Sequence, residues 1–287
     1  MAAVLTEARS NFHQGLVDRK TLSLSPDDVA SNADKSQRTS VSIALSIARA
    51  LSAECIPKKL DGQRAGKQFE EAVEQFLKDT FPLLQSLRPG QWSIENVGGS
   101  RAEYQIARYE PYSHLAELAR AIEGDRNLAS VLGNSYEISP DVLVLRNPEP
   151  DEVINRDQEL VDEDSGQRAI IRKSNQERSI VHAIVSCKWT LRSDRAQNAR
   201  SEALNVIRNR KGRTPHIAVV TGEPSPSRLA SLALGTGDID TVYHFALPEL
   251  IDAVNATDND EAVSMLSTLI DGKRLRDISD LPLDLAI

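Results

Sequence analysis

Two almost uninterrupted apolar runs constrain the fold of this chain more than any other feature. The first ends the segment Y-E-I-S-P-D-V-L-V-L-R at residues 136–146, and the second lies in the segment I-V-H-A-I-V-S-C-K-W-T at residues 180–190. A strand with one face in water alternates apolar and polar residues, whereas a run of this kind is typical of a strand covered on both faces. We therefore predict a central β-sheet with helices packed on it.

The C-terminal half of the chain alternates strand and helix patterns. Predicted strands follow at residues 216–221 and 240–246, and predicted helices at about 195–210, 226–233, 247–255 and 260–270. This alternation indicates an α/β fold whose central sheet is mixed or parallel and is flanked by helices.

The N-terminal part of the chain is expected to be mainly helical. Its first 40 residues are polar and rich in turn formers, and amphipathic helices are predicted at about 40–53, 67–81 and 111–122. The segment at 147–180 is acidic and lacks apolar periodicity, so we expect it to be a solvated excursion from the fold.

Length and composition fit one folded domain. The chain has 287 residues, of which 40% are hydrophobic and 26% charged, which is enough apolar material for a core. We expect a single domain over residues 1–287, with an N-terminal helical part at about 1–130 and an α/β core at about 131–287.

The charge of the chain is segregated along the sequence. The net charge is -8, with a pI near 5.3, which argues against indiscriminate coating of nucleic acid. Between residues 188 and 213, however, eight basic residues face two acidic ones, whereas residues 149–164 hold eight acids and one arginine. A basic cleft on an acidic protein is therefore feasible.

Cysteine, histidine and hydrophobic patterns exclude several other classes. Two cysteines are too few for a disulfide framework, and the five histidines show no zinc-ligand spacing. The N-terminus lacks the apolar core of a signal peptide, and no apolar run approaches the ~20 residues that span a bilayer. We expect a soluble protein of the cytoplasm without membrane contact.

Three side chains near the predicted strand ends have the chemistry to act on a phosphodiester. Side chains of a strand alternate faces, so Asp141 and Lys188 meet if the two apolar strands pair. On the next helix Glu202 shares a face with Ala199 and Val206, which turns it inward. Phosphodiester cleavage requires a divalent cation, carboxylates that hold it, and a cation that orients or stabilises the attacking water or hydroxide.

Each of these residues also has an ordinary structural interpretation. A Pro-Asp pair is usually part of a turn, a lysine that ends a strand is usually solvated, and a helical glutamate usually lies at the surface. The commoner nuclease pattern has an acid two residues before the lysine, and Ser186 occupies that position here. Glu202 would then have to supply the missing acid from another element.

An R-S-D-R cluster at residues 192–195 has the composition of a base-reading group. Arginine binds guanine O6 and N7 in a bidentate manner, and aspartate accepts a hydrogen bond from cytosine N4. The cluster stands at the start of a predicted helix, so a helix cap with an exposed ion pair is the competing interpretation.

These motifs, and others along nearly the whole chain, resemble the NgoMIV-like type II restriction endonucleases, whose sites share a C-C-G-G core. The resemblance rests on V-x-S-N-A-D-x-S at 29–36, on P-D at 140–141 and on the block that begins S-C-K-W-T-x-R-S-D-R at 186. It continues through R-N-R-K-G-R-x-P-H-I, P-S-R, A-L-G-T-G-x-I-D-x-V-Y-H-F-A-L and D-I-S-D-L-P-L-D-L-A.

The resemblance implies a PD-(D/E)XK core in which one acid has moved to another element. The positions implied to act in catalysis are Glu70, Asp141, Ser186, Lys188 and Glu202. Asp141 would be the central metal-binding carboxylate, Lys188 the catalytic lysine and Glu202 the displaced acid. Mg2+ is the implied cofactor, held by Asp141, Glu202 and the backbone carbonyl of Cys187, whose thiol points away.

The resemblance also implies which residues contact DNA. In the major groove, Arg192, Asp194 and Arg195 match the residues that read the C-C-G-G core. Asp34 and Arg228 match the residues that read the outer base pair. Further contacts are expected from Ser36 and, on the minor-groove side, from Gln63.

Taken together, these features predict a Mg2+-dependent type II restriction endonuclease that cuts double-stranded DNA at a palindromic G-C-C-G-G-C-like site. The implied assembly is a homotetramer made of two dimers, and the functional partner is a cognate DNA methyltransferase. One alternative is a sequence-specific DNA-binding protein of the same fold without cleavage, and another is a structure-specific repair nuclease. An intact acid–lysine–acid set argues against the first, and a base-reading cluster argues against the second.

Overall fold

A six-stranded mixed sheet organises the computed structural model, which describes residues 2–57, 60–97, 105–132, 138–191, 193–235 and 237–287. The strands follow the order β1-β2-β3-β4-β5-β6. Both β1–β2 and β2–β3 are antiparallel, and the pairs from β3 to β6 are parallel. Their bounds are β1 Trp92–Asn96, β2 Val142–Arg146, β3 Ile180–Lys188, β4 His216–Thr221, β5 Thr241–His244 and β6 Leu275–Asp277.

The two apolar runs form β2 and β3 in the middle of this sheet, as the sequence predicts. Val142 pairs with Val185 and Val144 with Ala183, and the register shifts between Val144 and Leu145. This pairing brings the residue before β2 to the end of β3. The α/β fold class with a central mixed sheet flanked by helices is confirmed.

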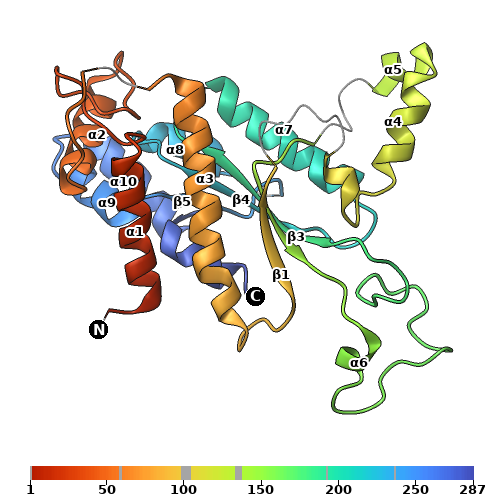
Figure 1. Ribbon diagram of the computed structural model, residues 1–287. Coiled ribbons are helices and arrows are strands. Elements are labelled where there is room, and N and C mark those ends of the chain that lie inside the picture. Colours follow the sequence, from red (N-terminus) through yellow and green to blue (C-terminus); the bar gives the residue numbers. More distant parts are fainter. Residues whose placement is uncertain (1, 58–59, 98–104, 133–137, 192, 236) are drawn as a thin grey trace.

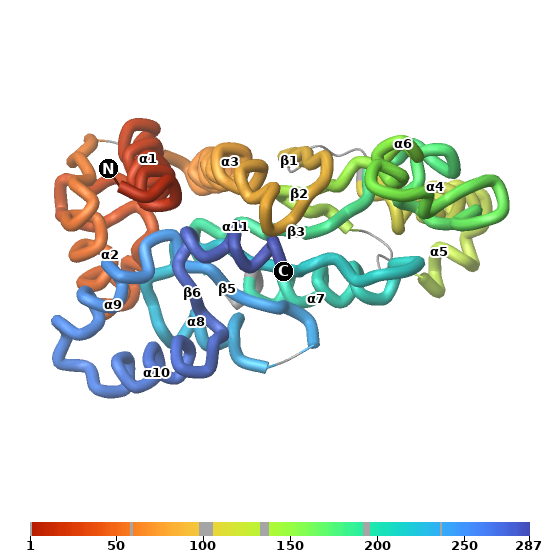
Figure 2. The backbone as a smooth tube through the Cα atoms, turned by 90° about the horizontal axis from the view of Figure 1, so that it is seen from below, coloured from red at the N-terminus to blue at the C-terminus, as the bar shows by residue number. Residues whose placement is uncertain are grey.

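Helices cover both faces of the sheet. In Figure 2, α1 and α3 lie on one side of it, whereas α7 and α8 lie on the other. Figure 1 shows α4, α5 and α6 projecting away from the sheet. The longer helices are α1 Val4–Asp18, α2 Arg38–Ala50, α3 Gly62–Thr80, α4 Leu115–Glu123, α7 Ser193–Asn209, α8 Pro226–Ala233, α9 Leu247–Asn255 and α10 Asp260–Asp271. The shorter ones are α5 Arg126–Leu132, α6 Asp151–Ile154, α11 Leu281–Asp284, η1 Phe81–Leu84, η2 Gln105–Arg108 and η3 Ile278–Asp280.

An aromatic cluster joins α3 to the end of β3. The ring of Trp189 lies 5.0 Å from that of Phe69 and 5.4 Å from that of Phe245, measured between centroids. These rings are buried. A Cβ on Gly222 would lie 2.6 Å from the Trp189 ring, so only glycine permits this approach. The cluster therefore fixes the chain around Lys188.

Two N-terminal elements differ from expectation. The segment predicted to be turn-rich contains α1, which packs against α3 through buried Phe12, Leu16 and Val17. The N-terminal part also supplies a strand, since β1 pairs with β2. Both elements are stabilised by tertiary burial rather than by a clear local pattern.

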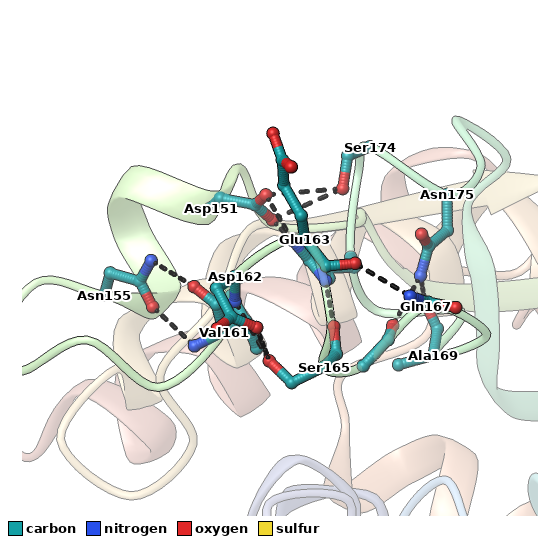
Figure 3. A network of polar contacts seen from close by, with 12 residues as sticks. Asp151, Asn155, Val161, Asp162, Glu163, Ser165, Gln167, Ala169, Ser174 and Asn175 are labelled. Atoms are coloured by element: carbon teal, nitrogen blue, oxygen red, sulfur yellow. Dashed lines mark hydrogen bonds and ion pairs between the residues drawn. The ribbon is translucent and has the colours of Figure 1, made fainter.

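The acidic excursion at 147–180 is held by a polar network rather than simply solvated (Figure 3). Arg172, only 7% exposed, donates to both carboxylate oxygens of Asp151 at 2.8 Å. Asn155 accepts a hydrogen bond from the backbone N–H of Val161 at 2.9 Å, and Ser165 donates to Asp162 at 2.7 Å. Side chains that bond locally replace the apolar core that this segment lacks.

Among the described residues, every helix falls short of the length and apolar character needed to cross a membrane.

Candidate active site

Asp141 and Lys188 meet at the end of the β2–β3 pair. The Nζ of Lys188 donates to Oδ2 of Asp141 at 3.0 Å. The same oxygen accepts from the backbone N–H of Cys187 at 2.7 Å and from the hydroxyl of Ser186 at 3.4 Å. The geometry therefore brings together an aspartate, a serine and a lysine. The alternation of side chains along paired strands predicts that these residues point to the same side.

The lysine is held as a cation. Burial lowers the pKa of Lys188, but the negative charges of Asp141 and Glu202 outweigh it, and the net pKa is raised. The amine therefore stays protonated near neutral pH, ready to stabilise negative charge at a bound phosphate.

Glu202 approaches this pair from α7. Ala199 and Val206 are buried on the same helical face, and that packing turns Glu202 inward. Its Oε1 is buried and has no hydrogen-bond partner among the described residues. Burial raises the pKa of Glu202 to about 7, with Lys188 opposing and Asp141 adding to the effect. A buried carboxylate oxygen without a partner is costly unless a cation or donor satisfies it.

Glu70 reaches the same place from α3. Burial, followed by the charge of Asp141, raises its pKa to about 7, and Lys188 and Lys67 oppose the shift. A cleft of about 500 Å³ opens here, and the residues lining it are Gly62, Gln63, Gly66, Lys67, Glu70, Cys187, Lys188, Trp189, Asn198, Ala199 and Glu202. Elements far apart in sequence thus build one acidic and cationic cleft.

The donor set of this cleft fits a hard divalent cation. Within the described ranges no three Asp, Glu, His or Cys side chains converge as a ready metal-ligand set. Mg2+, however, is usually held by one or two carboxylates with water and substrate phosphate completing its shell. Asp141 and the unpartnered Oε1 of Glu202 provide two such groups. The thiol of Cys187 is a poor ligand for this ion, because Mg2+ prefers oxygen ligands and burial raises the pKa of the thiol.

A second cluster lies beside the first. Arg228 forms an ion pair with Asp34, whose Oδ1 also accepts from the backbone N–H of Ser36 at 2.9 Å and from its hydroxyl at 2.7 Å. These bonds, with those of Ser36 first, lower the pKa of Asp34 to about 2. Asp34 therefore remains an ionised hydrogen-bond acceptor.

This second cluster opens into a cleft of about 380 Å³. Asp34 and Arg228 line it together with Gly62 and Trp189, and the last two also line the first cleft. Gln63 stands in the first turn of α3 at that junction, where the side chain of Asp61 caps the helix. Residues expected to act on the phosphate and residues expected to read the outer base pair thus line two neighbouring clefts that share Gly62 and Trp189.

The R-S-D-R group is only partly described. Arg192 lies outside the described residues. Asp194 and Arg195 belong to the first turn of α7, which begins at Ser193, but their side chains are outside the description. Their expected base contacts therefore stay predictions.

Glu223 is a buried acid of this region that the sequence did not reveal. It follows β4 and is 1% exposed. A lone glutamate before P-S-P has the appearance of a loop residue, and one of its two backbone donors, the N–H of Leu191, comes from a distant part of the chain.

An α/β sheet that pairs an aspartate with a lysine, next to an inward-facing glutamate, has the groups that a nuclease acting with a divalent metal requires. The profile described as NgoMIV restriction enzyme matches residues 12–287. The chain is also 49% identical over 287 residues, 100% of both proteins, to the type II restriction enzyme NgoMIV of Neisseria gonorrhoeae. The chain belongs to the NgoMIV restriction enzyme family, and it is a type II site-specific endonuclease.

The family predicted from the sequence is thus confirmed. Among solved structures, a restriction endonuclease PspGI–substrate DNA complex aligns with 99% of this chain and 92% of its own. The identity is 14% and the TM-score 0.25, a likeness too remote to support an argument.

Proposed function

We propose that this enzyme hydrolyses double-stranded DNA at a palindromic site with a C-C-G-G core, such as G-C-C-G-G-C, and that it requires Mg2+. The observation that supports this most is that Lys188 and Glu202 line one cleft and that Lys188 is hydrogen-bonded there to Asp141. The adjoining cleft holds Asp34 and Arg228, so a DNA duplex lying across both would be read beside the place where it is cut.

Asp141 and Glu202 would hold the metal ion, together with the backbone carbonyl of Cys187. When bound, Mg2+ supplies positive charge that offsets the charge developing on the phosphate. Lys188 donates toward the attacking water or the phosphate oxygens. Ser186, through its hydroxyl, steadies Asp141 in the position where most nucleases of this type have an acid.

Glu70, on α3, would add a third carboxyl group to the site. Because burial raises its pKa to about 7, it is available to hold or release a proton near neutral pH. Its proposed role is therefore to exchange a proton with water in the cleft that it lines together with Lys188 and Glu202.

Sequence reading is assigned to two groups of residues. Arg192, Asp194 and Arg195 would read the core in the major groove, where arginine binds guanine and aspartate accepts from cytosine. Asp34 and Arg228 would read the outer base pair, helped by Ser36. Gln63 would approach from the minor-groove side.

A palindromic site requires twofold protein symmetry, so that each subunit cuts one strand. The proposed assembly is a homotetramer made of two dimers, with a cognate methyltransferase protecting host DNA in the cytoplasm. Sedimentation should then give a tetramer, and plasmids with two sites should be cut faster than plasmids with one. A dimer that cuts both plasmids at equal rates would refute the assembly and leave the nuclease assignment intact.

The decisive experiment is digestion of a sequenced plasmid with Mg2+, followed by mapping of the ends. We expect breaks at C-C-G-G-core sites and none after the metal is chelated. Breaks at unrelated sequences, or cleavage that persists in chelator, would overturn the proposed specificity or the metal requirement.

A further inference from the structure

Glu223 uses both carboxylate oxygens inside the protein. Its Oε2 accepts a hydrogen bond from the backbone N–H of Leu191 at 2.8 Å, and its Oε1 accepts from the backbone N–H of Ser225 at 3.1 Å. The side chain is 1% exposed. A polar group buried to this degree is costly unless it has such partners, so these hydrogen bonds specify the local structure.

The two backbone groups lie just before the two helices that carry the proposed base-reading residues. Leu191 directly precedes the R-S-D-R group and α7, and Ser225 is the residue before α8, which carries Arg228. Arg228 closes the arrangement, because its Nη1 donates to the carbonyl of Leu191 at 3.0 Å and lies 3.8 Å from Oε2 of Glu223. The backbone N–H and the backbone carbonyl of Leu191 are therefore both hydrogen-bonded, the first to Glu223 and the second to Arg228.

The same loop is tied to the end of the catalytic strand. The hydroxyl of Thr221 donates to the carbonyl of Lys188 at 2.7 Å and accepts from the backbone N–H of Glu223 at 3.2 Å. Gly222 also donates its backbone N–H to the Lys188 carbonyl, at 3.1 Å. A displacement at Glu223 would consequently be felt by both base-reading elements and by the strand that carries Lys188.

We infer that Glu223 is a positioning residue for sequence discrimination: it locks the start of the core-reading helix to the start of the helix that carries Arg228, so that core and outer base pairs are read as one unit. This inference rests on the proposed function of those two groups. Glu223 does not touch DNA in this arrangement, since both of its oxygens are turned to the protein.

The test replaces Glu223 by glutamine and, as a second variant that keeps the charge, by aspartate. A glutamine has one acceptor oxygen and would direct an amide N–H at one of the two backbone donors. For parent and variants, kcat/KM is measured on the mapped site and on sites changed in the core or in the outer pair. We expect the ratio of cognate to altered sites to fall by roughly tenfold at both positions, the effect of losing one charge-assisted hydrogen bond.

Glu249→Gln is the matched control. Glu249 accepts hydrogen bonds from Arg9, but it belongs to α9 and lines none of the clefts described above. Its discrimination ratio should equal that of the parent. In an Arg228→Ala background, Glu223→Gln should cause no further loss of discrimination at the outer base pair, since the two residues act together there. It should still lower discrimination at the core base pairs.

The outcomes separate this inference from the proposed function. Where the parent cuts another sequence, the proposed specificity fails, and the discrimination ratio is then measured on that sequence. Glu223 variants that keep the parental ratio, with or without a lower melting temperature, overturn the positioning role. A lower ratio at both positions with an unchanged Glu249 control supports it.

Discussion

Glutamine at position 202 is expected to make the protein more stable at alkaline pH and inactive as a nuclease. Burial raises the pKa of Glu202 from an ordinary 4.5 to about 7. The folded protein therefore binds this proton more tightly than the unfolded chain does, and its stability falls as the pH rises from 4.5 through 7. One pH unit corresponds to about 1.4 kcal/mol, so the ionised carboxylate costs about 3 kcal/mol above pH 7.

Glutamine resembles the protonated acid at every pH and avoids this cost. In metal-free buffer at fixed protein concentration, urea unfolding at about pH 8.5 should give the variant up to about 3 kcal/mol more stability than the parent, and a much smaller difference at about pH 5. Burial also raises the pKa of Glu70 and of Glu223 to about 7. Both groups titrate in the parent and in the variant, so their contributions to the pH dependence of stability cancel when the two proteins are compared. Glu117→Gln, exposed on α4, serves as the control and should match the parent at both pH values.

Cleavage provides the second half of this test. The glutamine variant should lose activity at ordinary Mg2+ concentration, with partial rescue by high Mg2+ or by Mn2+, because an amide oxygen lacks the charge that holds the metal. A variant that is no more stable than the parent at about pH 8.5 would refute the view that Glu202 is ionised there at a structural cost. Full activity would show that another carboxylate fills its place.

Three further results are expected. Alanine at Lys188 or Asp141 should reduce plasmid cleavage by roughly 100-fold or more, while DNA binding in Ca2+ persists in a gel-shift assay; near-parental cutting by either variant contradicts the assigned site. Because burial raises the pKa of Glu202 to about 7, cleavage at limiting Mg2+ should fall about tenfold for each pH unit below 7, and a flat profile there would be incompatible with an ionised Glu202 holding the metal. Arg228→Ala should lower discrimination at the outer base pair by about 1–3 kcal/mol in competition cleavage, and an unchanged ratio argues against outer-pair reading.

The centre of the fold was predictable because its signals are local. Apolar runs identify β2 and β3, and the predicted bounds of β4, α8 and α9 agree with the structure. Strand alternation, with pairing of the two apolar strands, predicted Asp141 beside Lys188, and the apolar neighbours of Glu202 on its helix indicated that it turns inward.

What the sequence did not reveal depends on partners far along the chain. β1 holds polar Ser93, Glu95 and Asn96, and it is a strand only because β2 lies beside it. Glu223 is buried because the backbone of Leu191 meets it from 32 positions earlier, a contact that no local pattern announces.

The helix α7 carries both Glu202 and the proposed core-reading residue Arg195. Arg195, in the first turn of that helix, and Glu202 are seven residues apart, about 10 Å along the axis. A rotation or shift of α7 that accommodates a different core sequence would carry the carboxylate away from Lys188. Altered specificity obtained through this helix should therefore come with slower cutting.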